Sequence, residues 1–320
     1  MLFRKTIRKI VVLATAFCCI VLMHLYFNSK QVEKSRRSLT KVVALNATMS
    51  PLLTAPHQEH VIINLTNWDR FLTSPECGEY NMIIMVTSSP MNTEKRDSIR
   101  KTWGRGWYNQ VDLPKYRTFF QLGVSQDQRI HKLAVEEFAT NRDIVIGDFT
   151  DTFYALPVKV LMGFKWASSH CKFKYLFKID DDVFVHIPRT FEYLNRWYVP
   201  SKGLYTGHVQ FKTGPSRDGK YKITMREYPL KFYPAFVSGG GILLSTDVVE
   251  AMVRKFNVSN YFKLDDVFVG MLALQVGVFP IHDRYFNVWH DEKSCNCFST
   301  DIIHHKVGST KCMRILYDCK

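Results

Sequence analysis

The stretch that decides the fold is Tyr175-Leu-Phe-Lys-Ile-Asp-Asp-Asp-Val-Phe-Val185, in which an apolar run ends in three acidic residues and then resumes. Three adjacent carboxylates between apolar segments repel one another and resist desolvation, and a bound divalent cation removes both problems. In extended backbone Asp180 and Asp182 project to the same side while Asp181 points away. Carboxylate oxygens are hard ligands that suit Mn²⁺ or Mg²⁺. We therefore predict a metal site at Asp180 and Asp182; the alternative, a solvated acidic turn, fits the apolar flanks less well.

Outward from this stretch, short apolar runs alternate with longer helical patterns. The predicted strands are Met82–Thr87, Arg117–Gly123, Asp143–Gly147 and Tyr175–Ile179, and the predicted helices are Asn92–Trp103, His131–Ala139 and 155–169. Strands that alternate with crossover helices predict an α/β fold with a doubly wound, mostly parallel sheet. Ligands of such sheets bind beyond the carboxyl ends of the strands, which is where the acidic cluster falls.

The N-terminus predicts a membrane anchor. Residues 10–27 are apolar with one His and no formal charge, close to the length that spans a bilayer. A cleaved signal peptide is the alternative, but no small-x-small site follows the run. We expect a cytosolic tail at 1–9, a transmembrane helix at 10–27, a polar stem at 28–76 and a catalytic domain at 77–320. Of the formal net charge of +14, residues 1–41 contribute +8, from nine Lys/Arg and one acid, so the basic balance is no signal for nucleic acid.

Glycosylation signals and cysteines place the body of the chain in an oxidising lumen. Three Asn-x-Ser/Thr sequons, at Asn46, Asn64 and Asn257, all follow the apolar run. Six of the eight cysteines also follow it, and they are compatible with three disulfides of unknown pairing. Zinc is the weaker alternative, since Cys295-x-Cys297 lacks the usual spacer.

In addition, six ordered blocks of the chain resemble the β-1,3-galactosyltransferase and β-1,3-N-acetylglucosaminyltransferase family (glycosyltransferase family 31). The blocks are Glu94–Trp103, Phe119–Gly123, Asp143–Tyr154, Lys178–Val185, Tyr233–Gly241 and Leu264–Gly270. The resemblance implies a GT-A-like fold, a UDP-sugar donor, Mn²⁺ (with Mg²⁺ possible), a glycan acceptor on glycoprotein or glycolipid, and a single-pass type II protein of the Golgi membrane.

A second acidic pair, Asp265-Asp266, precedes a predicted helix over Val267–Gln275. We expect Asp265 to cap this helix. Family resemblance makes Asp266 the general base, and a carboxylate at a helix entrance tends to stay ionised, as proton abstraction requires. Capping alone is the alternative role for Asp266.

The resemblance also implies roles for residues at other matching positions. His305 is expected to be a third metal ligand. The residues expected at the nucleotide sugar are Thr87, Ser88, Arg96, Arg100, Asp148, Asp180 and Asp181. Trp103 is expected in the core, Asp151 and Lys159 in supporting positions, and Gly239–Gly241 either in a close approach to a sugar or in a tight turn.

These expectations define an inverting, metal-dependent transferase that moves a hexose, galactose by resemblance, to a glycan hydroxyl in β-1,3 linkage. N-acetylglucosamine and N-acetylgalactosamine remain alternative donors. A lumenal glycan-binding homologue without activity is the alternative from another class, and intact Asp180, Asp182 and Asp266 argue against it.

Overall fold

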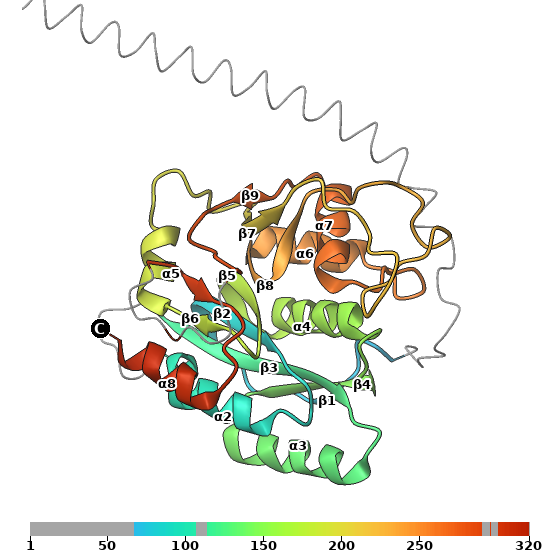
Figure 1. Cartoon of the computed structure of the whole chain (residues 1–320). Helices are drawn as coiled ribbons and strands as arrows, with labels where there is room; N and C mark the ends of the chain where they lie inside the picture. Colours follow the sequence, from blue (N-terminus) through green and yellow to red (C-terminus); the bar gives the residue numbers. More distant parts are fainter. Residues whose placement is uncertain (1–66, 107–113, 290–294, 296–299, 320) are drawn as a thin grey trace, which may run out of the picture. The chain divides into compact units, whose positions relative to one another are not determined.

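Eight strands form one mixed sheet in the order β1-β4-β3-β2-β5-β8-β7-β9 (Figure 1). The computed structural model describes residues 67–106, 114–289, 295 and 300–319. The strands of this sheet are β1 (Phe71–Thr73), β2 (Glu79–Thr87), β3 (Tyr116–Val124), β4 (Ile144–Thr150), β5 (Lys172–Asp180), β7 (Tyr205–Gln210), β8 (Phe236–Ser245) and β9 (Ile281–His282). A small second sheet pairs β6 (Phe184–Val185) with β10 (Ile303–His304).

The four central strands are parallel, as predicted, and they create a switch point. The chain adds β3 and β4 on one side of β2 and then returns to add β5 on the other side. At the carboxyl ends, Thr87 of β2 lies opposite Asp180 of β5. Sheets of this kind bind ligands where the strand order reverses. The acidic cluster therefore starts at this switch point.

Beyond β5 the sheet contains antiparallel pairs, which agrees with the mostly parallel (mixed) sheet of the expected GT-A-like fold, although no strand after β5 was predicted; β7 and β9 pair in parallel. Strand β8 runs antiparallel to both β5 and β7. Its register places Gly241 opposite Ile179. The three glycines Gly239–Gly241 thus lie inside a strand beside the end of β5, and the expectation of a tight turn is wrong.

Helices flank the sheet. They are α2 (Thr93–Lys101), the 3₁₀ turn η1 (Trp103–Arg105), α3 (Gln128–Asn141), α4 (Leu156–His170), α5 (Ile187–Leu194), α6 (Thr246–Lys255), α7 (Asp265–Gln275) and α8 (Thr310–Asp318). The helices α4, α6 and α7 pack against one another, and α2 packs against α8 (Figure 1). The apolar residues of α4, among them Val158, Leu161 and Trp166, are fully buried, because this helix is covered by the sheet on one side and by helices on the other.

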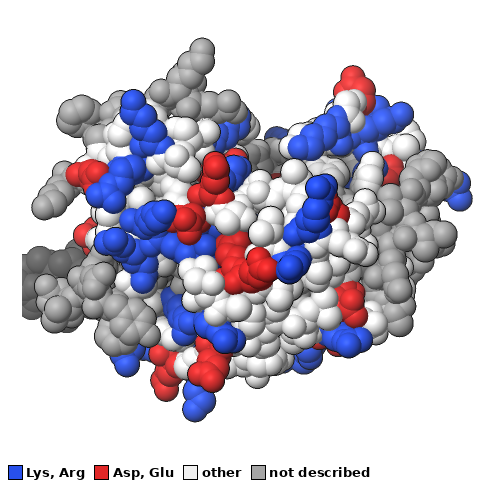
Figure 2. Space-filling view, turned by 90° about the horizontal axis from the view of Figure 1, so that it is seen from below, with Lys and Arg blue, Asp and Glu red and all other residues white. Residues whose placement is uncertain are grey.

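The first helix ends earlier than predicted. It stops at Lys101, and Trp103 begins the 3₁₀ turn. Trp103 is buried, as expected for a core residue. On the face that carries α2, α3 and α8, Lys and Arg side chains alternate with Asp and Glu (Figure 2). Within α2, Asp97 forms ion pairs with Arg100 and Lys101.

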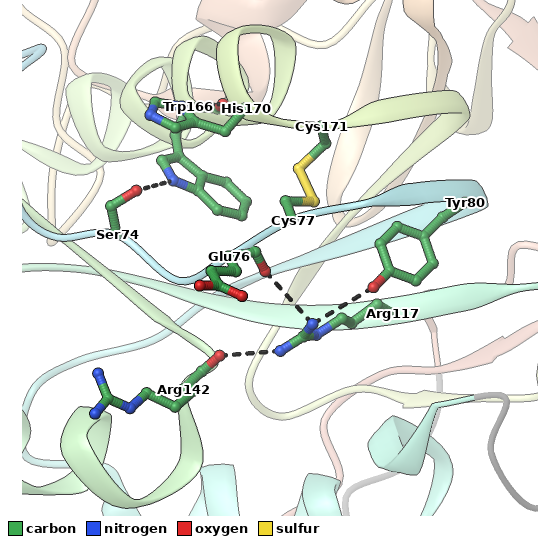
Figure 3. The surroundings of a disulfide bond; sticks show 9 residues. All are labelled: Ser74, Glu76, Cys77, Tyr80, Arg117, Arg142, Trp166, His170 and Cys171. Atoms are coloured by element: carbon green, nitrogen blue, oxygen red, sulfur yellow. Dashed lines mark hydrogen bonds between the residues drawn. A yellow bond between two sulfur atoms is a disulfide. The ribbon is translucent and has the colours of Figure 1, made fainter.

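A disulfide joins Cys77, just before β2, to Cys171, just after α4 (Figure 3). Around it, Trp166 Nε1 donates to Ser74 Oγ at 2.9 Å, and Arg117 donates to the Glu76 carbonyl at 3.4 Å. A second disulfide joins Cys295 to Cys312, which is contrary to a zinc site at these two thiols. Cys297 lies outside the described residues.

Removal of the first disulfide is expected to lower the free energy of unfolding by about 2–5 kcal/mol, since its cross-link spans 94 residues and restricts the unfolded chain. The variant is Cys77→Ser/Cys171→Ser, measured by urea denaturation with tryptophan fluorescence.

The matched control is Cys295→Ser/Cys312→Ser, whose separation is 17 residues. Chain entropy predicts that the control loses about 1–2 kcal/mol less than the long-range variant. Equal losses from the two variants would contradict the entropic explanation.

Among the described residues, no helix has the length and apolar character needed to cross a membrane. The predicted anchor at 10–27 lies outside them, as do the sequons at Asn46 and Asn64. Asn257 is described and exposed, and its side-chain oxygen accepts the Ser259 N–H at 3.0 Å. This sequon is therefore on the surface.

Candidate active site

Asp181 turns away from its two acidic neighbours, as predicted, although only Asp180 belongs to the extended strand and Asp181 and Asp182 lie in a turn. Its carboxylate is buried and accepts hydrogen bonds from Ser88 Oγ at 2.7 Å and Asn92 Nδ2 at 2.8 Å, and pairs with Lys95 Nζ at 3.0 Å. These contacts tie the end of β5 to the loop and helix that follow β2. Asp181, which was predicted to contact the nucleotide, therefore binds side chains of the protein instead, on the side of the acidic cluster that faces away from Asp180 and Asp182.

Asp180 and Asp182 meet His305 on the other side. One ligand atom from each of the three lies within 4.8 Å of the other two. His305 arrives there because β10 pairs with β6, the strand that directly follows Asp182. The Val307 N–H also donates to the Asp182 carbonyl at 2.7 Å. Pairing between the C-terminal segment and β6 therefore completes the cluster.

The geometry of the cluster fits a divalent cation. Asp182 Oδ1 is buried and has no hydrogen-bond partner among the described residues, and it lies 3.9 Å from His305 Nε2, beyond hydrogen-bond distance. His305 Nδ1 lies 3.2 Å from the Val288 carbonyl. A proton on Nδ1 leaves the Nε2 lone pair facing Asp182, which is the usual orientation of a metal-binding imidazole. Two carboxylates with one imidazole form a ligand set that Mn²⁺ accepts.

A buried lysine that sequence reasoning missed links the two acidic pairs. Lys178 is fully buried, and its Nζ contacts Asp180 Oδ1 at 2.7 Å, Asp265 Oδ2 at 3.1 Å and the Gly239 carbonyl at 2.9 Å. Burial alone would lower the pKa of Lys178, but the two carboxylates outweigh burial and raise it. The available signal was a lysine in an apolar strand, two residues before Asp180 and hence on the same face.

The negative charges of Asp265 and Asp182, together with burial, outweigh the positive charge of Lys178 at Asp180. Burial, Asp265 and Asp182 raise the pKa of Asp180 to about 6, although Lys178 opposes them. A carboxyl group with this environment gains from a nearby cation. This agrees with the ligand role predicted for Asp180.

Asp265 does not cap α7, and that expectation is wrong. The residue before the helix is Leu264, and Asp265 is the first helical residue, where it pairs with Lys178 instead. Asp266 follows as the second residue of the helix. Its Oδ1 accepts the Val267 N–H at 2.8 Å and its Oδ2 accepts the Gly239 N–H at 3.3 Å.

The pKa of Asp266 is raised to about 7, first by burial and then by the Asp265 carboxylate. The two backbone N–H donors favour the ionised form but do not compensate. The expectation that the helix entrance alone keeps Asp266 ionised was therefore incomplete. A base with a pKa near neutral pH is well matched to proton abstraction.

Gly239 lies between the two acidic groups. A Cβ atom at this position would lie 3.6 Å from Asp266 Cβ, 3.6 Å from Lys178 Nζ and 3.7 Å from Asp180 Oδ2. At Gly240 it would lie 3.2 Å from the His305 ring. The absence of side chains at these glycines lets the backbone of β8 lie close to both the metal cluster and the candidate base. The predicted close approach to a sugar stays a prediction.

Thr87 and Ser88 reach the switch point but are both buried. Thr87 Oγ1 accepts from Gln121 Nε2 at 2.7 Å, and the Ser88 hydroxyl donates to Asp181. Lys159 Nζ contacts the Ser88 carbonyl at 2.8 Å and Asp151 Oδ1 at 2.7 Å. These contacts link Lys159 and Asp151 to the end of β2, and their supporting role at the nucleotide stays a prediction.

The structure gives the two predicted arginines a structural role. Arg96 is fully buried and forms a two-pronged pair with Glu137 at 2.8 and 2.6 Å. Arg100 forms a similar pair with Asp143 at 2.7 and 2.8 Å and also contacts Glu137. Because these guanidinium groups are committed to carboxylates of the protein, we withdraw the expectation that they bind a diphosphate.

Asp148 also lies apart from the cluster. It lies on β4, and its carboxylate contacts Asn67 Nδ2 at 3.3 Å and Arg70 Nη1 at 3.6 Å. Two strands, β3 and β2, separate β4 from the acidic residues of β5. The structure does not bring Asp148 to the other predicted residues.

The protein thus belongs to the class of α/β proteins with a candidate cation site and a separate carboxylate near the sheet's switch point. The galactosyltransferase family model matches residues 94–284, and the chain belongs to this family. The match begins at the start of α2 and covers Lys178, the three acidic residues, the glycines and Asp266.

Named relatives agree with this assignment. The chain is 30% identical to mouse β-1,3-galactosyltransferase 1 over 284 residues, covering 87% of this chain and 84% of that protein. It is 34% identical to zebrafish lactosylceramide 1,3-N-acetyl-β-D-glucosaminyltransferase A over 218 residues, covering 64% of this chain and 57% of the relative. Among solved structures, the WbbM bifunctional glycosyltransferase has a TM-score of 0.38 at 8% identity, covering 78% of this chain and 50% of that chain. The family assignment rests on the sequence matches alone.

Proposed function

We propose that this protein is an inverting, metal-dependent β-1,3-glycosyltransferase that transfers galactose from UDP-galactose to a glycan hydroxyl. The observation that carries the proposal is the meeting at Gly239 of a candidate cation site and a half-buried carboxylate with a raised pKa of about 7. Transfer to an alcohol needs stabilisation of the leaving diphosphate and removal of the acceptor proton. The two groups supply one requirement each.

Asp180, Asp182 and His305 would hold the cation, and Lys178 keeps the first of these carboxylates in place. When bound, the cation supplies Lewis-acid stabilisation to the departing diphosphate. Asp266 receives the proton of the acceptor hydroxyl as that oxygen forms a bond to the anomeric carbon and the bond from this carbon to the diphosphate oxygen breaks. One displacement with one base inverts the configuration, as in inverting glycosidases, so an α-linked donor yields a β-linked product.

Galactose is our choice because the family model and a galactosyltransferase that is 30% identical over 87% of this chain both favour it. N-acetylglucosamine is the second candidate, since the zebrafish relative is named for that transfer. The two donors differ at C2 and C4, and the shape of the pocket selects between them.

The test uses the full chain purified in detergent, with Mn²⁺, single UDP-sugars and a panel of glycosides. We expect UDP release with UDP-galactose and a β-1,3-linked product by NMR. If UDP is released with another UDP-sugar and not with UDP-galactose, that sugar nucleotide is the donor instead. Binding of a UDP-sugar or glycan without any release would favour the non-catalytic alternative. If the chain binds none of the UDP-sugars, the proposal is overturned.

We also propose that the protein is a type II protein of the Golgi membrane with its catalytic domain in the lumen. The exposed sequon at Asn257 supports this orientation. In cells, Asn257→Gln is expected to remove one glycan of the intact protein. A tag at Met1 reports the orientation of the N-terminus by protease protection in intact vesicles. The orientation is contradicted if Asn257→Gln leaves the electrophoretic mobility unchanged and proteases reach the tag only after the vesicles are opened.

The pH dependence of the reaction is expected to follow Asp266. Because the carboxylate form is the base, and burial raises its pKa to about 7, kcat/KM should fall about tenfold per pH unit below that value and level off above it. The measurement is initial rate against pH at low acceptor and saturating Mn²⁺. If kcat/KM does not change between pH 5 and pH 8, the range in which the base of the free enzyme should titrate, this assignment is contradicted.

A further inference from the structure

Three exposed rings and one half-buried ring form a patch at the edge of the sheet that carries β7 and β9. They are His208, Phe211, His282 and Trp289, which we call the aromatic platform. The His208 ring lies 5.2 Å from the His282 ring and 6.0 Å from the Trp289 ring, and Phe211 lies 6.4 Å from His282. Trp289 is 70% exposed and Phe211 is 61% exposed. Large aromatic surface left in water at one place marks a binding site more often than a structural feature.

The platform is held in place before any ligand binds. Trp289 Nε1–H donates to His208 Nε2 at 3.1 Å, and the Trp289 backbone N–H donates to Asn287 Oδ1 at 3.0 Å. His282 Nδ1 accepts the Val209 N–H at 3.1 Å. Burial and the neighbouring His282 lower the pKa of His208, which favours the neutral ring that accepts from Trp289. A pre-oriented ring loses little entropy when it binds a ligand.

The platform is continuous with the candidate active site. Val288, the residue before Trp289, has its carbonyl 3.2 Å from His305 Nδ1. A Cβ atom on Gly240 would lie 3.4 Å from a Val288 methyl group. Consecutive Cα atoms lie about 3.8 Å apart, so the platform begins one residue from the groups that surround the metal cluster.

We propose that the aromatic platform binds a neutral pyranose ring of the acceptor glycan. This inference rests on the proposed function and names an acceptor subsite for it. The platform contains no Lys, Arg, Asp or Glu side chain, which suits an uncharged sugar and not the anionic diphosphate of the donor. The electron-rich face of Trp289 attracts the weakly positive C–H bonds on one face of a pyranose. Because His282 accepts the Val209 N–H at Nδ1, its ring proton lies on Nε2, where it can donate to a sugar hydroxyl.

The test measures sugar binding directly, so that it does not depend on turnover. Saturation-transfer NMR is recorded on the full chain with Mn²⁺ and UDP, using methyl β-galactoside, methyl β-N-acetylglucosaminide and lactose as probes. Trp289→Ala is expected to raise the Kd of the bound probe about tenfold or more, and Trp289→Phe to recover part of the loss. The control is Trp197→Ala, which removes a tryptophan that is 93% exposed elsewhere on the surface and should leave the Kd unchanged.

His208 is a positioning residue in this proposal. His208→Ala should weaken probe binding several-fold, and His208→Gln, whose side-chain oxygen can accept from Trp289, should restore it. UDP release in the absence of acceptor should be unchanged in all platform variants, since they do not touch the donor.

The two proposals fail in different ways. If the wild-type chain binds none of the probes, or if Trp289→Ala behaves as Trp197→Ala does, the platform proposal is overturned even where UDP is released. If the probes bind through Trp289 but no UDP-sugar is ever bound or cleaved, the acceptor subsite stands as a glycan-binding site and the proposed enzymatic function fails.

Discussion

Asp266→Asn is expected to lower kcat by about 10²–10⁴-fold while the affinity for the UDP-sugar stays within a few-fold of wild type. The substitution keeps the size of the side chain, and an asparagine oxygen can still accept the N–H of Val267 or Gly239. It removes only the capacity to take a proton. Transfer rates are compared with donor binding measured by calorimetry in the presence of Mn²⁺.

A matched control exists in the same fold. Asp247 is also the second residue of a helix, α6, but it is exposed and its carboxylate accepts the Gly203 N–H at 2.9 Å. Asp247→Asn should leave kcat unchanged. Transfer by Asp266→Asn at the wild-type rate would show that another group, or water, is the base.

Asp182→Ala is expected to abolish Mn²⁺-dependent binding of the donor. Asp182 supplies a buried oxygen without another partner among the described residues, so its removal deletes a ligand rather than a structural contact. Loss of groups that only support metal ligands costs about 10–100-fold in affinity, and loss of a ligand should exceed that. Electron paramagnetic resonance of free Mn²⁺ measures the affinity, and calorimetry with UDP measures its consequence.

The same experiment tests His305, the most distant member of the cluster in sequence. His305→Ala should weaken Mn²⁺ by about tenfold or more if its Nε2 is a ligand. Asp218→Ala, an exposed acid on the loop between β7 and β8, serves as a control and should bind Mn²⁺ normally. Undiminished Mn²⁺ binding by Asp182→Ala would place the cation elsewhere and remove the basis of the proposed function.

Local pattern was sufficient for the central half of the sheet. The apolar runs that form β2, β3, β4 and β5 are continuous and separated by helical patterns. The sequence therefore predicted that these segments are strands and that they run parallel. Strand β8 and the β6–β10 pair were missed. Strand β8 contains three consecutive glycines, which weaken any strand signal, and β6 and β10 have only two residues each.

In the candidate site, too, some features followed from the sequence and others only from the tertiary structure. From sequence alone we predicted that Asp180 and Asp182 share a side and that Asp181 faces the other, and the structure agrees. The assumed extended backbone was wrong beyond Asp180, because Asp181 and Asp182 lie in a turn. Only the tertiary structure decided what each carboxylate meets: His305 beside Asp182, Lys178 between Asp180 and Asp265, and protein partners for Arg96 and Arg100. It also decided the raised pKa of Asp266, because the pKa depends on burial and on Asp265 being held close by. Periodicity is a property of neighbouring residues, whereas burial and long-range contact are properties of the folded chain, and the chemistry of this protein depends on both.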